Sequence, residues 1–170
     1  MSVPDVSQLA APDAVVALRS YPRRLRAAVL PLADDPTVEA FAERVGPDGH
    51  SAVDIVVTVT NTWVLLGQAL RQILVSDEPM LHAGVLDPAQ RVWDPPPGTS
   101  ADGALDRLAD EATVLADAVD GVASRDWSRT GTVAGGGSII AIDLVREAVR
   151  VGAQGLTDAQ AAIRAARIGS

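Results

Sequence analysis

Apolar positions recur at spacings of three and four along most of this chain, which is the pattern of amphipathic α-helices. The segment from Ser51 to Val75 differs because it carries apolar side chains on more than one face and contains no proline. We interpret it as a central helix that packs on several sides. Ser51 and Asp54 form an S-x-x-D capping box at its start, in which each side chain satisfies an unpaired backbone amide.

Helical patterns also precede and follow this central segment. One begins at Pro12 and Asp13, and Pro22 within it predicts either a kink or a start delayed until after Ser20. A short helix is predicted from Thr37 to Val45, before a Gly-Pro-Asp-Gly turn.

The second half of the chain predicts three more helices. Thr99 to Asp102 forms a capping box ahead of a regular stripe whose acidic opposite face we interpret as solvated. A further stripe runs over 139–156. Thr157 with Gln160 predicts the cap of a separate final helix.

Two connections carry turn signals. The long connection Ser76–Thr99 contains five prolines, and connections of this length are often lids or binding segments. His82 within it is within reach of a pocket mouth, although a lone loop histidine more often has no such role. The Gly-rich segment Arg125–Ile140 predicts a small hairpin or an extended bend, followed by a flexible turn in which Ser138 caps the next helix.

Composition favours one soluble domain. With 170 residues and 48% hydrophobic content, the chain suffices for a full core, and we expect a lead-in over residues 1–12 and a single domain over 13–168. No uncharged apolar run has the length of a membrane span, and the N-terminus lacks the features of a signal peptide, so a cytoplasmic location is expected. The net charge of −8 and pI near 4.6 argue against nucleic acid and anionic membranes as partners.

Residue usage excludes several kinds of chemistry. The chain has no Cys, which removes disulfides, thiolate catalysis and Cys-based metal sites, and no Lys, which removes Schiff-base chemistry. Only His50 and His82 are histidines, so a three-His metal site within one chain is impossible. The remaining candidate for a binding site is the polar cluster Thr58–Thr62 inside the apolar central helix. Buried polar groups need partners and often line a pocket.

Three motifs together resemble the DinB-like (YfiT-like) superfamily of four-helix bundles, which includes the mycothiol-dependent maleylpyruvate isomerase group. The first is G-x-S-x-x-D at Gly49–Asp54, where family members commonly show W-S-x-x-E. The second is the Pro-rich crossing segment that ends in Trp93-Asp94, and the third is W-x-R-T-G at Trp127–Gly131. The helix that follows the third motif fits the family frame at Leu144, Ala148, Val149, Leu156 and Asp158. The resemblance covers residues 13–168.

The resemblance implies an all-α, DinB-like four-helix bundle with a long Pro-rich crossover and a small extended or hairpin segment before the fourth helix. In the family, one His on the second helix and an H-x-x-x-H pair on the fourth bind a divalent metal. The matching positions here are Thr58, Arg150 and Gln154, and none of them is His. A guanidinium cannot ligate a cation, and hydroxyl and amide groups are weak ligands for transition metals. We therefore expect no metal and no cofactor.

Two interpretations of Arg150 and Gln154 stay open on the sequence. They can lie on a solvent-exposed helix face, where Glu147 and Arg150 form an i, i+3 ion pair. Alternatively, they converge with Thr58 in the former metal cleft, where Arg150 would hold an anionic group such as a carboxylate. In that case Asn61 and Asp54, one turn to either side of Thr58, face the same cleft. Asp54 can equally pair with Arg150 and leave no ligand site.

Three functions are compatible with these sequence features. The first is a metal-free bundle that binds a small molecule, with an anion as one candidate, at Thr58, Asn61, Arg150, Gln154 and Asp54, with catalysis only if Arg150 polarises or orients a substrate. The second is the family chemistry, a thiol-dependent transfer or isomerisation with mycothiol as cosubstrate and a divalent metal held in an unrecognised way. The third is a non-catalytic bundle that acts through a homodimer or a partner protein. No catalytic residue can be assigned from the sequence.

Overall fold

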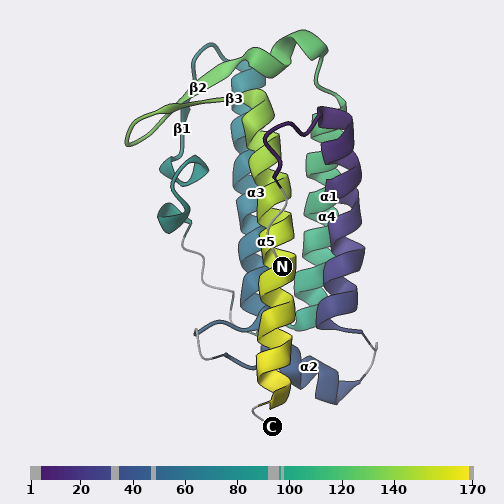
Figure 1. The fold of residues 1–170 in the computed structure, drawn as a ribbon. Helices are drawn as coiled ribbons and strands as arrows, with labels where there is room; N and C mark the ends of the chain where they lie inside the picture. Colours follow the sequence, from purple (N-terminus) through teal and green to yellow (C-terminus); the bar gives the residue numbers. More distant parts are fainter. Residues whose placement is uncertain (1–4, 32–34, 47–48, 92–95, 97, 169–170) are drawn as a thin grey trace.

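The computed structural model describes residues 5–31, 35–46, 49–91, 96 and 98–168. Four long helices form the body of the molecule: α1 (Ala11–Val29), α3 (Ala52–Val75), α4 (Ala101–Asp120) and α5 (Ala141–Ile168). In the bundle, α3 packs against α4 and α5, and α1 packs against the same two helices (Figure 1). The short helix α2 (Pro36–Glu43) lies across one end.

The central helix follows the sequence closely. Ser51 is the N-cap of α3, its side chain accepts from the Asp54 amide, and the Asp54 carboxylate accepts from the Ser51 amide in return. Both sides of the capping box predicted from the sequence are therefore present. By length and composition α3 could cross a membrane, but 67% of its most apolar window is buried inside the bundle, which is typical of the core helix of a soluble protein.

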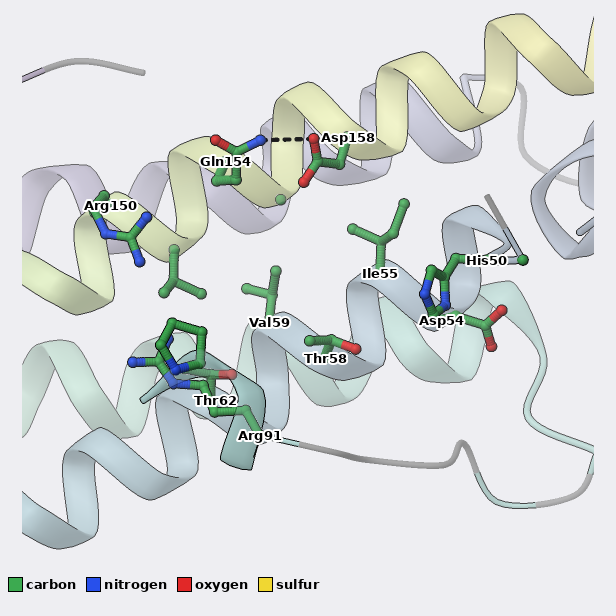
Figure 2. A pocket seen from close by; sticks show the side chains of 14 residues that line it. His50, Asp54, Ile55, Thr58, Val59, Thr62, Arg91, Arg150, Gln154 and Asp158 are labelled. Atoms are coloured by element: carbon green, nitrogen blue, oxygen red, sulfur yellow. Dashed lines mark hydrogen bonds between the residues drawn. The ribbon is translucent and has the colours of Figure 1, made fainter. Parts of the chain in front are cut away.

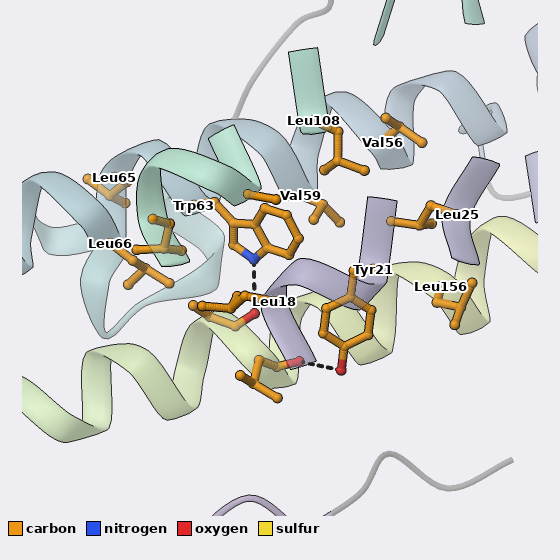
Figure 3. Close-up of a cluster of buried hydrophobic side chains, with 14 of the residues drawn as sticks. Leu18, Tyr21, Leu25, Val56, Val59, Trp63, Leu65, Leu66, Leu108 and Leu156 are labelled. Carbon is orange, nitrogen blue, oxygen red and sulfur yellow. Dashed lines mark hydrogen bonds between the residues drawn. The ribbon is translucent and has the colours of Figure 1, made fainter. Parts of the chain in front are cut away.

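Two aromatic side chains join α1 and α3 to α5 inside the core (Figure 3). The Trp63 indole Nε1 donates to the Ala148 carbonyl at 2.9 Å, and the Tyr21 hydroxyl donates to the Val149 carbonyl at 3.2 Å. Both rings are almost fully buried, so each polar tip has a partner where water cannot reach it. Gly152 makes room for both rings, since a Cβ there would lie 2.7 Å from the Tyr21 ring and 3.0 Å from that of Trp63.

A three-stranded sheet closes the other end of the bundle. Strand β1 (Met80–Leu81) pairs in parallel with β2 (Thr130–Val133), which pairs antiparallel with β3 (Ser138–Ile140). The hairpin predicted before the fourth long helix is confirmed. Its turn is formed by Gly135–Gly137, which all adopt positive φ angles that favour glycine.

The W-x-R-T-G motif has a structural role at this end. It lies on a short 3₁₀ helix, η3 (Ser124–Ser128), and the start of β2. The Arg129 guanidinium donates to the carbonyls of Ile73 and Ser76, at 2.8 and 3.1 Å, where α3 ends and its last carbonyls lack helical partners. The motif therefore fixes the end of the central helix against the sheet.

Several boundaries differ from the predictions. Helix α1 starts at Ala11 and continues through Pro22, so the delayed start is wrong. Ser100, not Thr99, caps α4, because its side chain accepts from the Gly103 amide. Ser138 belongs to β3 and is not a helix cap.

The final helix is not separate. Helix α5 runs unbroken past Thr157, whose hydroxyl donates to the Ala153 carbonyl one turn earlier instead of capping a new helix. The long connection after α3 also has more structure than predicted, with β1 and the 3₁₀ turns η1 (Ala83–Val85) and η2 (Pro88–Gln90). Trp93-Asp94 lies outside the described residues.

Candidate ligand-binding cleft

A cavity of about 760 Å³ opens between α3 and α5, with η2 over one end (Figure 2). The two helices run antiparallel, as shown by Val59 beside Gly155 and by Trp63 bonded to Ala148. This register sets the level of each side chain in the cavity. The residues that line it are Gly49, His50, Asp54, Ile55, Thr58, Val59, Thr62, Pro88, Arg91, Arg150, Val151, Gln154, Gly155 and Asp158.

Four of the five residues predicted for a pocket line this cavity. Thr58 and Asp54 come from α3, and Arg150 and Gln154 come from α5. Successive members on each helix are four residues apart, which places them one above the other on the same face. Thr58, Arg150 and Gln154, the three positions that the resemblance matches to metal ligands, therefore line one cavity.

Asn61, the fifth predicted residue, lies elsewhere. Its Oδ1 accepts from Arg107 Nη2 on α4 at 3.0 Å, and it does not line the cavity. At 100° per residue, Asn61 stands about 60° around α3 from Thr58, on the side away from Val59 and α5. Thr62, one residue further on, stands about 40° from Thr58 on the α5 side and takes the place predicted for Asn61.

An ion cluster forms one end of the cavity. Arg150 donates to Glu147 with two nitrogens, Nε to Oε2 at 2.6 Å and Nη2 to Oε1 at 2.8 Å. Arg91 approaches the same Oε1 with its Nη2, also at 2.8 Å. The orientation of the Arg91 side chain is fixed by η1, because its Nε and Nη2 donate to the carbonyls of Gly84 and Val85. The side chains of Arg91, Glu147 and Arg150 are 6%, 18% and 40% exposed, respectively.

The electrostatics of this cluster leave it positive. Burial raises the pKa of the Glu147 carboxyl, but hydrogen bonds from Arg150 and Arg91 outweigh that effect and bring the pKa below its ordinary value of 4.5. The hydrogen bond to Glu147 in turn raises the pKa of Arg150. Two guanidiniums against one carboxylate give a net charge of +1 at this end of the cavity.

Donors remain unused at the same end. Within the described residues, Nη1 of Arg91 and Nη1 of Arg150 make no hydrogen bond. The Thr62 hydroxyl is also without a partner in that part of the chain, although the residue is only 1% exposed. A buried hydroxyl without a partner costs free energy, so it marks a place where a ligand or a water molecule belongs.

Carboxylates mark the opposite end. Asp54 uses Oδ2 to accept from the amide and hydroxyl of Ser51, at 2.7 and 2.8 Å. Asp158 uses Oδ1 to accept from Gln154 Nε2 at 2.7 Å. His50 also lines this end (Figure 2). His82 does not reach the cavity, because its Nδ1 caps η1 by accepting from the Gly84 amide.

The residues at the three positions that the resemblance matches to metal ligands do not fit a metal. Thr58 and Gln154 offer neutral oxygens, and Arg150 brings a positive charge to the place where a cation would sit. Across residues 5–31, 35–46, 49–91, 96 and 98–168, no three His, Asp or Glu side chains gather closely enough to hold a metal ion.

Comparisons with known proteins settle the fold alone. No family model matches the chain, and no curated protein sequence matches it. A solved structure does, described as "YfiT from Bacillus subtilis is a probable metal-dependent hydrolase with an unusual four-helix bundle topology". It superimposes with a TM-score of 0.71 over 99% of this chain and 93% of the YfiT chain. The fold is a DinB-like four-helix bundle. The sequences are only 14% identical, so the similarity supports a shared fold but gives no information about activity.

Sequence reasoning missed four polar residues that line this cleft, namely His50, Thr62, Arg91 and Asp158. Arg91 lies in the Pro-rich connection, where nothing in the periodicity indicates which side chain turns inward. Thr62 belongs to the polar cluster of the central helix, but the prediction selects Asn61 from that cluster. Counting helical angles from Thr58 towards the α5 side is the signal that would have selected it.

Proposed function

We propose that this protein is a metal-free, DinB-like bundle that binds a small carboxylate-bearing molecule in the cleft between α3 and α5. The ligand's carboxylate would sit at the end formed by Arg91, Arg150 and Thr62. The observation that carries the proposal is the buried Thr62 hydroxyl without a partner in the described chain, beside two arginines that each keep an unused Nη1.

The geometry explains why an anion is favoured there. Glu147 engages Nε and Nη2 of Arg150 and holds Nη2 of both arginines at its Oε1, so the two guanidiniums are neighbours in a fixed orientation. Glu147 neutralises only one of the two charges. An incoming carboxylate would therefore gain charge-assisted hydrogen bonds without first ordering long, mobile side chains.

The same contacts bear on the other two functions. Asp54 bonds to Ser51 and Arg150 bonds to Glu147, so the Asp54–Arg150 pair that would close the cleft does not form. A metal-dependent thiol transfer with mycothiol would need ligands that Thr58, Arg150 and Gln154 do not supply. We assign no catalytic step, because Glu147, the carboxylate of the arginine end, is already engaged by both arginines.

Calorimetric titration at low salt tests the proposal with octanoate as the probe and octanamide as its uncharged counterpart. We expect octanoate to bind and octanamide to bind at least tenfold more weakly, since hydrogen bonds to charged groups are worth about 1.5–3 kcal/mol. Arg150→Gln should weaken octanoate by a similar factor. Arg164→Gln, an equal charge change at an exposed site on the same helix, should leave binding unchanged.

Two results would overturn the proposal. One is equal binding of octanoate and octanamide, or no binding of either, which removes the anion site. The other is stoichiometric Ni, Zn or Mn retained by the purified protein after metal incubation and desalting, measured by plasma mass spectrometry. In that second case a metal site exists that these residues do not predict, and thiol-transfer assays with mycothiol become the next step.

A further inference from the structure

The cleft carries opposite charges at its two ends. Arg91 and Arg150 lie at one end, and Asp54 and Asp158 lie at the other (Figure 2). The antiparallel register of α3 and α5 produces this separation, because the end of the cavity near Thr62 on α3 faces Arg150 on α5. An anion alone would use only the first of these ends.

Acceptors at the acidic end are left unused. Asp54 makes both of its hydrogen bonds through Oδ2, and Asp158 makes its one hydrogen bond through Oδ1. Within the described residues, Asp54 Oδ1 and Asp158 Oδ2 have no hydrogen-bond donor. The acidic end therefore offers acceptors to a cationic donor, just as the arginine end offers donors to an anion.

The distance between the ends is set by the helices. Arg150 and Asp158 are eight residues apart on α5, which is about 12 Å along the axis. Between them the lining combines the apolar residues Ile55, Val59, Val151 and Gly155 with the polar side chains of Thr58 and Gln154. A ligand that reaches both ends must therefore be elongated, with an apolar middle.

We propose that the ligand class is an elongated zwitterion, with a carboxylate at Arg91 and Arg150, an ammonium group at Asp54 and Asp158, and an apolar spacer between them. This inference rests on the proposed function, because it keeps the carboxylate at the arginine end. It adds the second charged group and the length. The acidic end also disfavours a dicarboxylate of the same length, since its second carboxylate would meet Asp54 and Asp158.

Calorimetric titration with 8-aminooctanoate, octanoate and 4-aminobutanoate tests the inference on the whole chain at low salt. We expect 8-aminooctanoate to bind about fivefold more tightly than octanoate, the gain of one exposed ion pair. The four-carbon 4-aminobutanoate is too short to reach both ends and should lose that gain. Asp158→Asn leaves Asp54 in place, so it should bring the affinity for 8-aminooctanoate closer to that for octanoate, and octanoate itself should bind the variant no more weakly than it binds the wild type.

The outcomes separate this inference from the proposed function. If octanoate binds as tightly as 8-aminooctanoate and Asp158→Asn affects both equally, the zwitterion is wrong and the anion site stands. If 8-aminooctanoate binds in an Arg150→Gln variant as well as in the wild type, the carboxylate is not at the arginine end and both proposals fall. Asp158 is exposed and the Arg150 side chain is 40% exposed, so neither substitution removes a side chain of the core.

Discussion

Glu147 and Arg150 stand one turn apart on α5 and share two hydrogen bonds, of 2.6 and 2.8 Å. On a free helix surface such an i, i+3 pair stabilises by only a few tenths of a kcal/mol. Here the carboxylate is 18% exposed and has a second partner in Arg91, which is 6% exposed and comes from a separate segment of the chain. The pair is therefore part of a partly buried cluster that holds the connection before α4 onto the bundle.

Removing Arg91 should cost more stability than removing Arg150. Arg91→Gln deletes the ion pair to Glu147 and the bonds to the Gly84 and Val85 carbonyls, so we expect a loss of roughly 3 kcal/mol. Arg150→Gln leaves Glu147 with its more buried partner and should cost about 1 kcal/mol. Urea unfolding followed by circular dichroism measures both values.

Arg164→Gln is the matched control for this pair, and its effect should stay within about 0.5 kcal/mol because the side chain is exposed. Equal losses for Arg91→Gln and Arg150→Gln would contradict the structure. That result would mean that Arg91 does not anchor the connection in solution.

The lowered pKa of Glu147 predicts a specific loss of stability in acid. A carboxyl whose pKa is lower in the folded state than in the unfolded state stabilises the fold above its unfolded pKa, here near 4.5, and that contribution disappears as the pH falls through the folded pKa. Glu147→Gln cannot titrate. The difference in unfolding free energy between wild type and Glu147→Gln should therefore shrink between about pH 6 and pH 3. A difference that stays constant over this range would show that Glu147 is not held by the two arginines.

Local signals in the sequence predicted much of this fold. The capping box of Ser51 and Asp54 involves residues three apart, so it is readable without the rest of the chain. The glycines before Ser138 likewise predicted a bend because their backbone angles are local. The same local logic failed at Thr157, where the expected cap lies inside an unbroken helix, because packing of α5 along the bundle outweighs a weak capping preference.

The site was predictable only where the helix register determines it. Thr58, Arg150 and Gln154 follow from register and from the family resemblance, and all three line the cleft. Arg91 is different, because its position depends on how η1 docks against α3. Gly84 allows that docking, since a Cβ there would lie 3.2 Å from Leu65 of α3, and no periodicity in the sequence reports such a contact.

Two glycines on α5 should resist substitution. A Cβ at Gly155 would overlap Val59 Cγ2, and one at Gly152 would lie 2.7 Å from the Tyr21 ring. We expect Gly155→Ala and Gly152→Ala each to destabilise the fold by about 1–3 kcal/mol, because overpacking outweighs the gain in helix propensity. Thermal unfolding measures the change. Gly67→Ala on α3 is the control and should be neutral or stabilising, since its Cβ would lie 3.4 Å from the movable end of the Leu115 side chain; a stabilised Gly155→Ala would contradict the close packing of α3 and α5.

Introducing histidines at Thr58, Arg150 and Gln154 should create a metal site. In the variant Thr58→His, Arg150→His, Gln154→His, the two α5 imidazoles are at i and i+4 on one face, and the third comes from the facing helix. We expect one Zn²⁺ or Ni²⁺ per chain after desalting, measured by plasma mass spectrometry, and an increase in thermal stability when the metal is added.

The position of Asn61 provides a matched control for that variant. Replacing Thr58→His by Asn61→His keeps three histidines and the pair on α5 but places the third imidazole towards Arg107 and α4, outside the cleft. Two imidazoles on one helix face lack the third ligand of a zinc site, so this control should bind metal far more weakly. Equal binding by the two variants would mean that Thr58 does not face α5 across the cleft. Tight binding by the Thr58 variant alone would show that positions 58, 150 and 154 surround one point. The poor fit of the natural chain for a metal would then come from its side chains and not from its backbone.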